Sequence, residues 1–145
     1  MTERSILIVD DDIDHAVILR TVIATVAPNA PTDTCTDPIR LPGVLLEAEP
    51  DAVVFIDRML LGVESFRYVR EAAEQRPDLH LVVLSAALSE ADEKRALAAG
   101  AADALEKPGS LSEWRAMLTR VLDAADRRDH RRDGSHPAEG AERAG

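Results

Sequence analysis

S-I-L-I-V-D-D-D, residues 5–12, is the strongest indication of fold class in this chain. Its apolar part is rich in β-branched residues and stops abruptly at three carboxylates, Asp10, Asp11 and Asp12. Such a run is typical of a strand buried in a parallel sheet, whose carboxyl end opens to solvent. We therefore expect a buried strand over residues 5–9, followed by an acidic loop at one edge of a sheet.

The same pattern of strand, polar residue, loop and helix returns along the chain. Strands are predicted at residues 32–36, 52–56, 79–84 and 101–105, and helices at 13–27, 38–49, 63–75, 89–99 and from Ser110 or Ser112 onward. Strands that alternate with helices imply a parallel sheet covered on both faces. We expect an α/β fold with a doubly wound, flavodoxin-like sheet of five parallel strands in the order 2-1-3-4-5, and five helices.

Length and composition point to one domain. A chain of 145 residues that is 46% hydrophobic can bury one good core, which we place at residues 1–125. Residues 126–145 contain five acidic and five basic side chains and no aliphatic residue larger than alanine. This segment is predicted to be a disordered charged tail.

The overall charge restricts the partners. A formal net charge of −10 argues against direct binding of nucleic acid, which requires clustered basic residues. No apolar stretch approaches the roughly 20 residues that span a bilayer. The single cysteine, Cys35, can form no internal disulfide, which agrees with a reducing compartment. A cytoplasmic protein without membrane contact is therefore expected.

Polar residues that could carry chemistry stand at the strand ends. Asp10 and Asp11 follow the first strand, Asp57 ends the third, Ser85 ends the fourth, and Lys107 lies just past the fifth. These ends meet at one edge of the sheet. Carboxylates that are crowded together require a compensating cation, and hard oxygen ligands favour Mg²⁺.

Such a site would attract a phosphate. With a divalent ion in place, the Lys107 ammonium and the Ser85 hydroxyl can contact phosphoryl oxygens, and Asp57 is left as the nucleophile. The four histidines show no metal-ligand spacing and are not expected to take part. Trp114 is expected to pack in the core, since it lies at helical spacing from Leu111 and Leu118.

Four motifs resemble those of the response-regulator receiver family: I-L-I-V-D-D-D, V-V-F-I-D-R-M, L-V-V-L-S-A and A-L-E-K-P, in that order, over residues 5–121. The resemblance implies that Asp11 ligates Mg²⁺ directly, that Asp10 assists through water, and that Asp57 accepts the phosphoryl group. The backbone carbonyl of Met59 would be a further metal ligand. Four matches at strand ends are far more specific than any one of them.

The resemblance also implies partners and an output. A histidine kinase or a phosphotransfer protein would donate the phosphoryl group, and a downstream protein of unknown identity would read it. No output domain fits after Val121, so we expect a single-domain response regulator. It would be no enzyme beyond its own phosphorylation and dephosphorylation.

The chain departs from the family's pattern at several positions. Ala104 stands where many receivers carry the Tyr or Phe whose ring rotates on activation, which puts the usual signalling face in doubt. Leu61 and Ser65 stand where members often carry Pro and Gly. Met59 and Ala87 occupy positions that, in the family, help to orient the hydrolytic water, and neither side chain hydrogen-bonds water well. We therefore hypothesise slow self-dephosphorylation.

Two alternatives remain open. The first is a receiver-like interaction scaffold that works without phosphorylation, which would keep its binding after Asp57→Asn. The second is a magnesium-dependent phosphohydrolase similar to the haloacid dehalogenase family, in which Asp10 of the D-x-D pair Asp10 and Asp12 is the nucleophile. The second alternative lacks a later strand that ends in paired carboxylates and leaves Asp57 without a role.

Overall fold

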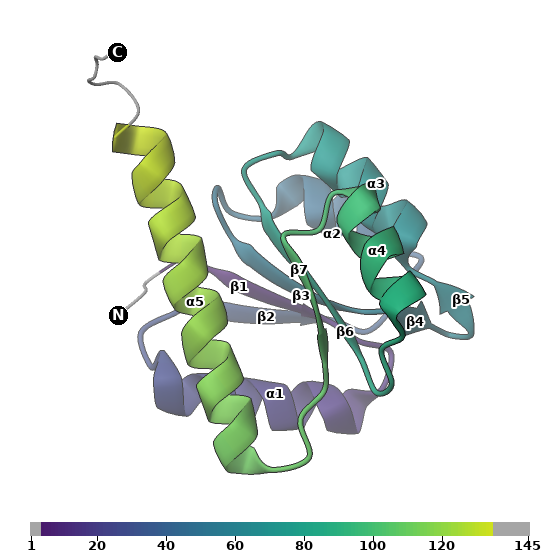
Figure 1. Ribbon diagram of the computed structural model, residues 1–145, viewed down its shortest axis with the longest axis horizontal. Helices are drawn as coiled ribbons and strands as arrows, with labels where there is room; N and C mark the ends of the chain where they lie inside the picture. Colours follow the sequence, from purple (N-terminus) through teal and green to yellow (C-terminus); the bar gives the residue numbers. More distant parts are fainter. Residues whose placement is uncertain (1–3, 135–145) are drawn as a thin grey trace.

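The computed structural model describes the backbone of residues 4–134 and the side chains through Arg128. Its centre is one sheet of five parallel strands (Figure 1), as predicted. These are β1 (Ile6–Val9), β2 (Thr32–Cys35), β3 (Val53–Asp57), β6 (His80–Ser85) and β7 (Asp103–Glu106). Their order is β2-β1-β3-β6-β7, which is the predicted 2-1-3-4-5 when these strands alone are counted.

Helices cover both faces of the sheet (Figure 1). One face carries α1 (Ile13–Val26) and α5 (Leu111–Gly134), and the other carries α2 (Leu41–Glu47), α3 (Phe66–Gln75) and α4 (Glu90–Ala99). Among the helices that the structure describes, none combines the length and the apolar character needed to cross a membrane. The doubly wound architecture is confirmed.

The strands bury both of their faces, which explains their continuous apolar runs. In β1, Ile6 and Ile8 pack toward α1 and α5, whereas Leu7 and Val9 pack toward the other three helices. Phe55 of β3 is 1% exposed and lies on the α1 and α5 side. Because helices cover both faces of the sheet, only the strand ends can present polar groups to solvent.

Helix α4 begins and ends where the sequence predicts. The Ser89 hydroxyl caps it by accepting a hydrogen bond from the Asp92 N–H at 3.0 Å. Gly100 ends it at a φ of +114°, a left-handed conformation that favours glycine. A β-carbon at Gly100 would lie 2.4 Å from that of Ala73, so close packing of α4 on α3 also requires the glycine.

The segment after Asp57 differs from the prediction. Residues 63–75 show helical spacing, yet α3 begins only at Phe66, because β4 (Met59–Leu60) and β5 (Val63–Glu64) pair as an antiparallel hairpin. Its turn places Leu61 and Gly62 at φ values of +50° and +79°. Elsewhere α2 is shorter than the predicted 38–49, and β7 begins two residues later than predicted.

The last helix is longer than predicted. Residues 126–134 continue α5, where the sequence predicts the start of a disordered tail. Asp126 accepts a hydrogen bond from Arg4 Nε at 3.0 Å, and Arg128 donates to the carbonyls of Pro77 and Leu79 at 2.7 and 3.0 Å. These contacts with the far end of the sheet hold the charged segment in place. Residues 135–145 of the predicted tail lie outside the described part of the chain.

Candidate functional site

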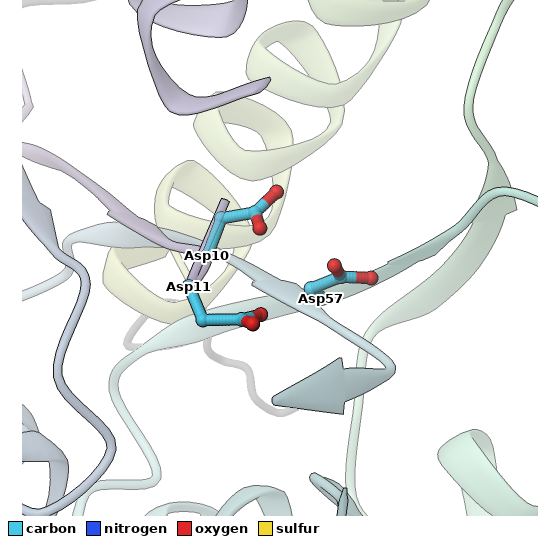
Figure 2. Close-up of side chains that lie close together, drawn as sticks. All are labelled: Asp10, Asp11 and Asp57. Carbon is cyan, nitrogen blue, oxygen red and sulfur yellow. The ribbon is translucent and has the colours of Figure 1, made fainter. Parts of the chain in front are cut away.

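Three carboxylates gather where β1 and β3 end. Asp10, Asp11 and Asp57 each offer an oxygen within 4.8 Å of the others, and Figure 2 shows the three side chains reaching into one common space. The structure thus brings together all three side chains that the sequence predicts as metal ligands. Hard oxygen donors at this spacing fit a divalent cation such as Mg²⁺.

Asp10 is fixed in its orientation. Its side chain is 8% exposed, its Oδ1 accepts a hydrogen bond from the Asp12 N–H at 2.9 Å, and its Oδ2 lies 3.2 Å from Lys107 Nζ. A buried carboxylate with both oxygens engaged keeps its position. The metal side of the site is therefore preorganised by the loop that follows β1.

Lys107 lies between the carboxylates and α1. Its Nζ is 3.2 Å from Asp10 Oδ2, 3.4 Å from Asp57 Oδ2 and 3.3 Å from Nδ1 of His15. Its backbone N–H donates to the Ser85 carbonyl at 2.8 Å, which fixes the loop after β7 beside the end of β6. This ammonium pairs with both Asp10 and Asp57 and so balances part of the negative charge of the acidic site.

The environment of Asp57 makes its ionisation unfavourable. Burial raises the pKa of this carboxyl above its ordinary value; the Lys107 ammonium lowers it, and the charges of Asp10 and Asp11 raise it further. The net direction is upward, so the lysine compensates the burial and the two neighbouring carboxylates incompletely. A bound divalent cation would relieve what remains.

Ser85 reaches the same edge but is engaged elsewhere. The residue is 3% exposed, its hydroxyl donates to the Ala87 carbonyl at 2.9 Å, and it accepts a hydrogen bond from Arg58 Nε at 3.3 Å. Met59 opens β4 two residues past Asp57 and is half-buried. Metal ligation by its carbonyl and phosphate contact by Ser85 stay predictions.

Sequence reasoning missed two neighbours of the site. The histidines show no metal-ligand spacing in the sequence, yet His15 lies against Lys107. Its position in the first turn of α1, directly after the acidic loop, is a signal that could have identified it. Arg58, which follows Asp57 and contacts Ser85, is not marked by any functional spacing in the sequence. Its contact depends on side-chain direction, which strand periodicity leaves open.

Asp12 has a structural role at the start of α1. Its Oδ1 accepts hydrogen bonds from the N–H groups of Asp14 and His15 at 3.0 and 3.3 Å, which is the geometry of a helix N-cap. In the phosphohydrolase alternative, Asp12 would instead face the substrate as the second acid of a D-x-D pair. The cap argues against that alternative.

Two further positions fit their predicted surroundings. Ala104 is 2% exposed and belongs to the core cluster on the side of α2, α3 and α4, so no ring extends from this point of β7. Trp114 is half-buried and packs against the opposite core cluster, as predicted. It also lines a cavity of about 310 Å³ that contains Asp10 and Lys107.

Comparison with known proteins agrees with this geometry. The family model for the response regulator receiver domain matches residues 6–119. The comparison with curated proteins found no match.

Several solved structures share the fold. The signal receiver domain of the DNA binding response regulator protein merR from Colwellia psychrerythraea 34H is 23% identical, with a TM-score of 0.71 over 82% of this chain and 98% of that chain. A CheY-like response regulator receiver domain protein from Methanospirillum hungatei JF-1 is 17% identical, with a TM-score of 0.73 over 88% and 99%. A response regulator protein from Burkholderia pseudomallei, solved with a phosphorylated aspartic acid, a calcium ion and citrate, is 16% identical, with a TM-score of 0.70 over 93% and 76%.

Identities this low establish the fold alone, whereas the family model spans most of the chain and includes every residue of the acidic site. The fold, the placement of Asp57 and Lys107 and the family match agree. This chain belongs to the response regulator receiver domain family.

Proposed function

We propose that this receiver domain accepts a phosphoryl group on Asp57 in a Mg²⁺-dependent reaction. The observation that carries the proposal is the position of Lys107 Nζ, 3.4 Å from Asp57 Oδ2 and 3.2 Å from Asp10 Oδ2. An ammonium held between a nucleophilic carboxylate and a metal-binding carboxylate can follow the negative charge as it moves onto the phosphoryl oxygens. A lysine that served only to neutralise the surface would have no reason to be buried there.

Four groups would hold the metal: the carboxylates of Asp10, Asp11 and Asp57 and the carbonyl of Met59. A bound Mg²⁺ would supply charge stabilisation for the transferring phosphoryl group. Both oxygens of Asp10 already have a protein partner, the Asp12 N–H and Lys107 Nζ, so this carboxylate would reach the metal through a remaining lone pair or through water. The crowding that raises the pKa of Asp57 favours metal binding.

The transfer is a displacement at phosphorus. An oxygen of Asp57 forms the new P–O bond, and the P–N bond of a donor phosphohistidine breaks. The donor imidazole leaves with the electron pair of that bond and takes a proton from solvent. Lys107 turns an N–H toward a phosphoryl oxygen, and the Ser85 hydroxyl does the same after leaving the Ala87 carbonyl.

The donor in this proposal is a histidine kinase or a phosphotransfer protein in the cytoplasm. The domain then works as a single-domain response regulator, either by contact with a downstream protein or by passing the phosphoryl group onward. It catalyses no reaction beyond its own phosphorylation and dephosphorylation. The Burkholderia pseudomallei structure, with its phosphorylated aspartic acid, is a precedent on the same fold.

A chemical trap tests the proposed acceptor. Sodium borohydride reduces an aspartyl phosphate to homoserine, so protein treated with acetyl phosphate and Mg²⁺ should yield homoserine at position 57 by peptide mass spectrometry. Homoserine at position 10 would instead support the phosphohydrolase alternative. Homoserine at neither position would contradict phosphorylation.

The metal site has its own test. Trp114 is the chain's single tryptophan and lines the cavity that contains Asp10 and Lys107, so its fluorescence can report Mg²⁺ binding. Asp11→Asn should weaken binding by about tenfold or more, since even changes behind metal ligands reduce affinity this much. Asp14→Asn, an exposed position in the first turn of α1, is the matched control and should bind Mg²⁺ as the wild type does. Equal affinities in all three proteins would refute the proposed ligand set.

A further inference from the structure

Four charged side chains form a cluster between the β4–β5 hairpin and α4. This four-charge cluster consists of Arg58, Glu64, Asp92 and Arg95. Glu64 binds Arg95 through both carboxylate oxygens, at 2.7 and 3.0 Å. Arg58 Nη1 lies 3.5 Å from Glu64, and Arg58 Nε lies 3.6 Å from Asp92. The charges balance, so an additional charge placed beside the cluster would disturb it.

Arg58 connects this cluster to the phosphorylation site. Its Nε lies 3.3 Å from Ser85 Oγ, and the residue directly follows Asp57. Its backbone is fixed, because its N–H donates to the Leu84 carbonyl at 2.7 Å and its carbonyl accepts from the Ser65 N–H at 2.8 Å. The backbone contacts leave the side chain free to change its rotamer, and this side chain is 24% exposed, which leaves it room to turn.

The other end of the connection is a helix with little apolar anchorage. The buried residues of α4 are Ala96 and Ala99, both in its second half. Two alanine side chains bury little apolar area, so they fix the helix weakly. The first turn is held instead by the Ser89 cap and by Asp92, whose side chain is 19% exposed and faces Arg58. A change in charge at Arg58 therefore acts where α4 is least anchored.

We propose that Arg58 transmits phosphorylation of Asp57 to the first turn of α4, an inference that rests on the proposed function. An aspartyl phosphate carries close to two negative charges beside the guanidinium. When the Ser85 hydroxyl turns to the phosphoryl group, the Arg58 guanidinium turns in the same direction, and its contact with Asp92 breaks. The first turn of α4 then loosens, and a partner reads that change. Arg58 is a positioning residue in this account.

The proposal supplies a readout that does not need an aromatic ring at position 104. Ala104 is a buried methyl group and cannot rotate between two positions as a ring can. The four-charge cluster instead provides two arrangements for Arg58, one with Asp92 and one with the phosphoryl group. Both arrangements pair the guanidinium with a negative charge, so neither leaves a partly buried cation without a partner.

Amide hydrogen exchange in α4 tests the inference. The protein is compared with and without acetyl phosphate and Mg²⁺, and the phosphorylated fraction is measured by intact mass on the same samples. In the wild type, we expect the amides of Asp92 and Glu93 to exchange about threefold faster or more after phosphorylation, as loss of one charged contact allows.

Variants assign that change to the cluster. Arg58→Ala and Asp92→Asn, compared with the wild type at equal phosphorylated fraction, should exchange at one rate with and without the phosphoryl group. Asp92→Asn keeps the test valid if the Arg58 variant fails to fold. Arg67→Ala removes an exposed arginine of α3 outside the cluster and should respond as the wild type does.

The possible outcomes distinguish a failure of the proposed function from a failure of the role of Arg58. A wild type that gains no phosphoryl group overturns the proposed function and the inference with it. A wild type that is phosphorylated without faster exchange in α4, or an Arg58→Ala protein that responds as strongly as the wild type, overturns only the role of Arg58.

Discussion

Lys107 Nζ lies 3.4 Å from Asp57 Oδ2, a contact between residues fifty positions apart in the chain. Within the part of the chain that the structure describes, Lys107 is the basic residue that forms ion pairs with Asp10 and Asp57. We predict that Lys107→Met lowers the free energy of unfolding by about 1–3 kcal/mol in chelator, and that Mg²⁺ restores much of the loss. Denaturant unfolding with EDTA and with Mg²⁺ measures both. Lys94→Met, at an exposed position of α4, is the control, and an equal loss in the two variants would show that the effect is not specific to the site.

Asp57→Asn is predicted to stabilise the metal-free protein at neutral pH. The folded protein raises the pKa of Asp57 above its unfolded value, so the folded state binds this proton more tightly. The associated stability is present below the unfolded pKa and is lost as pH rises through the folded pKa. The asparagine amide has no charge to desolvate. The Tm of the Asp57→Asn protein in EDTA at pH 7 should therefore exceed that of the wild type. A lower Tm would contradict the account of the acidic site.

Acid sensitivity is predicted at His80. Burial lowers the pKa of His80 to about 4, with Arg128 and Arg4 acting in the same direction, and its buried Nδ1 has no hydrogen-bond partner within the described residues. Between pH 6.5 and about 4, His80 therefore binds a proton in the unfolded chain but stays neutral in the folded protein. Stability is lost as pH falls through this window. Comparison with His80→Phe isolates the effect, because all other titrating groups are shared. The variant should lose less stability over this range, and parallel pH profiles would exclude His80 as the cause.

Slow loss of the phosphoryl group is predicted from the side chains of Met59 and Ala87. Met59 is half-buried, Ala87 is exposed, and neither carries a group that hydrogen-bonds water well. Met59→Asn and Ala87→Glu should each speed dephosphorylation, by about tenfold if the new group positions the attacking water. Decay of the phosphorylated mass after removal of acetyl phosphate gives the rate. Unchanged rates in both variants would remove the basis for this hypothesis.

Much of the fold and site could be predicted because strand ends are strongly constrained. Buried parallel strands leave few places for polar residues, and their carboxyl ends share one edge, so Asp10, Asp57 and Lys107 had to lie near one another. The β4–β5 hairpin was missed because β4 is only two residues long and falls in the predicted loop, while Val63 of β5 also fits helical spacing. Its turn requires Leu61 at positive φ, which only the folded context reveals.

Side-chain networks and helix ends were harder to predict. The contacts of Arg58 with Ser85 and Asp92 depend on rotamers, which sequence spacing does not fix. The end of α5 was placed too early because residues 126–134 are highly charged, and composition alone favours disorder. The contacts of Asp126 and Arg128 with distant parts of the chain, which hold this segment, are tertiary.

The proposed function requires that Asp57 is the phosphoryl acceptor and that its phosphorylation depends on Mg²⁺. Intact mass spectrometry of the wild type and Asp57→Asn, after incubation with acetyl phosphate and either Mg²⁺ or EDTA, tests it most directly. We expect a gain of one phosphoryl group in the wild type with Mg²⁺ and no gain in EDTA or in the variant. No gain in the wild type with Mg²⁺, or an equal gain in Asp57→Asn, would contradict it.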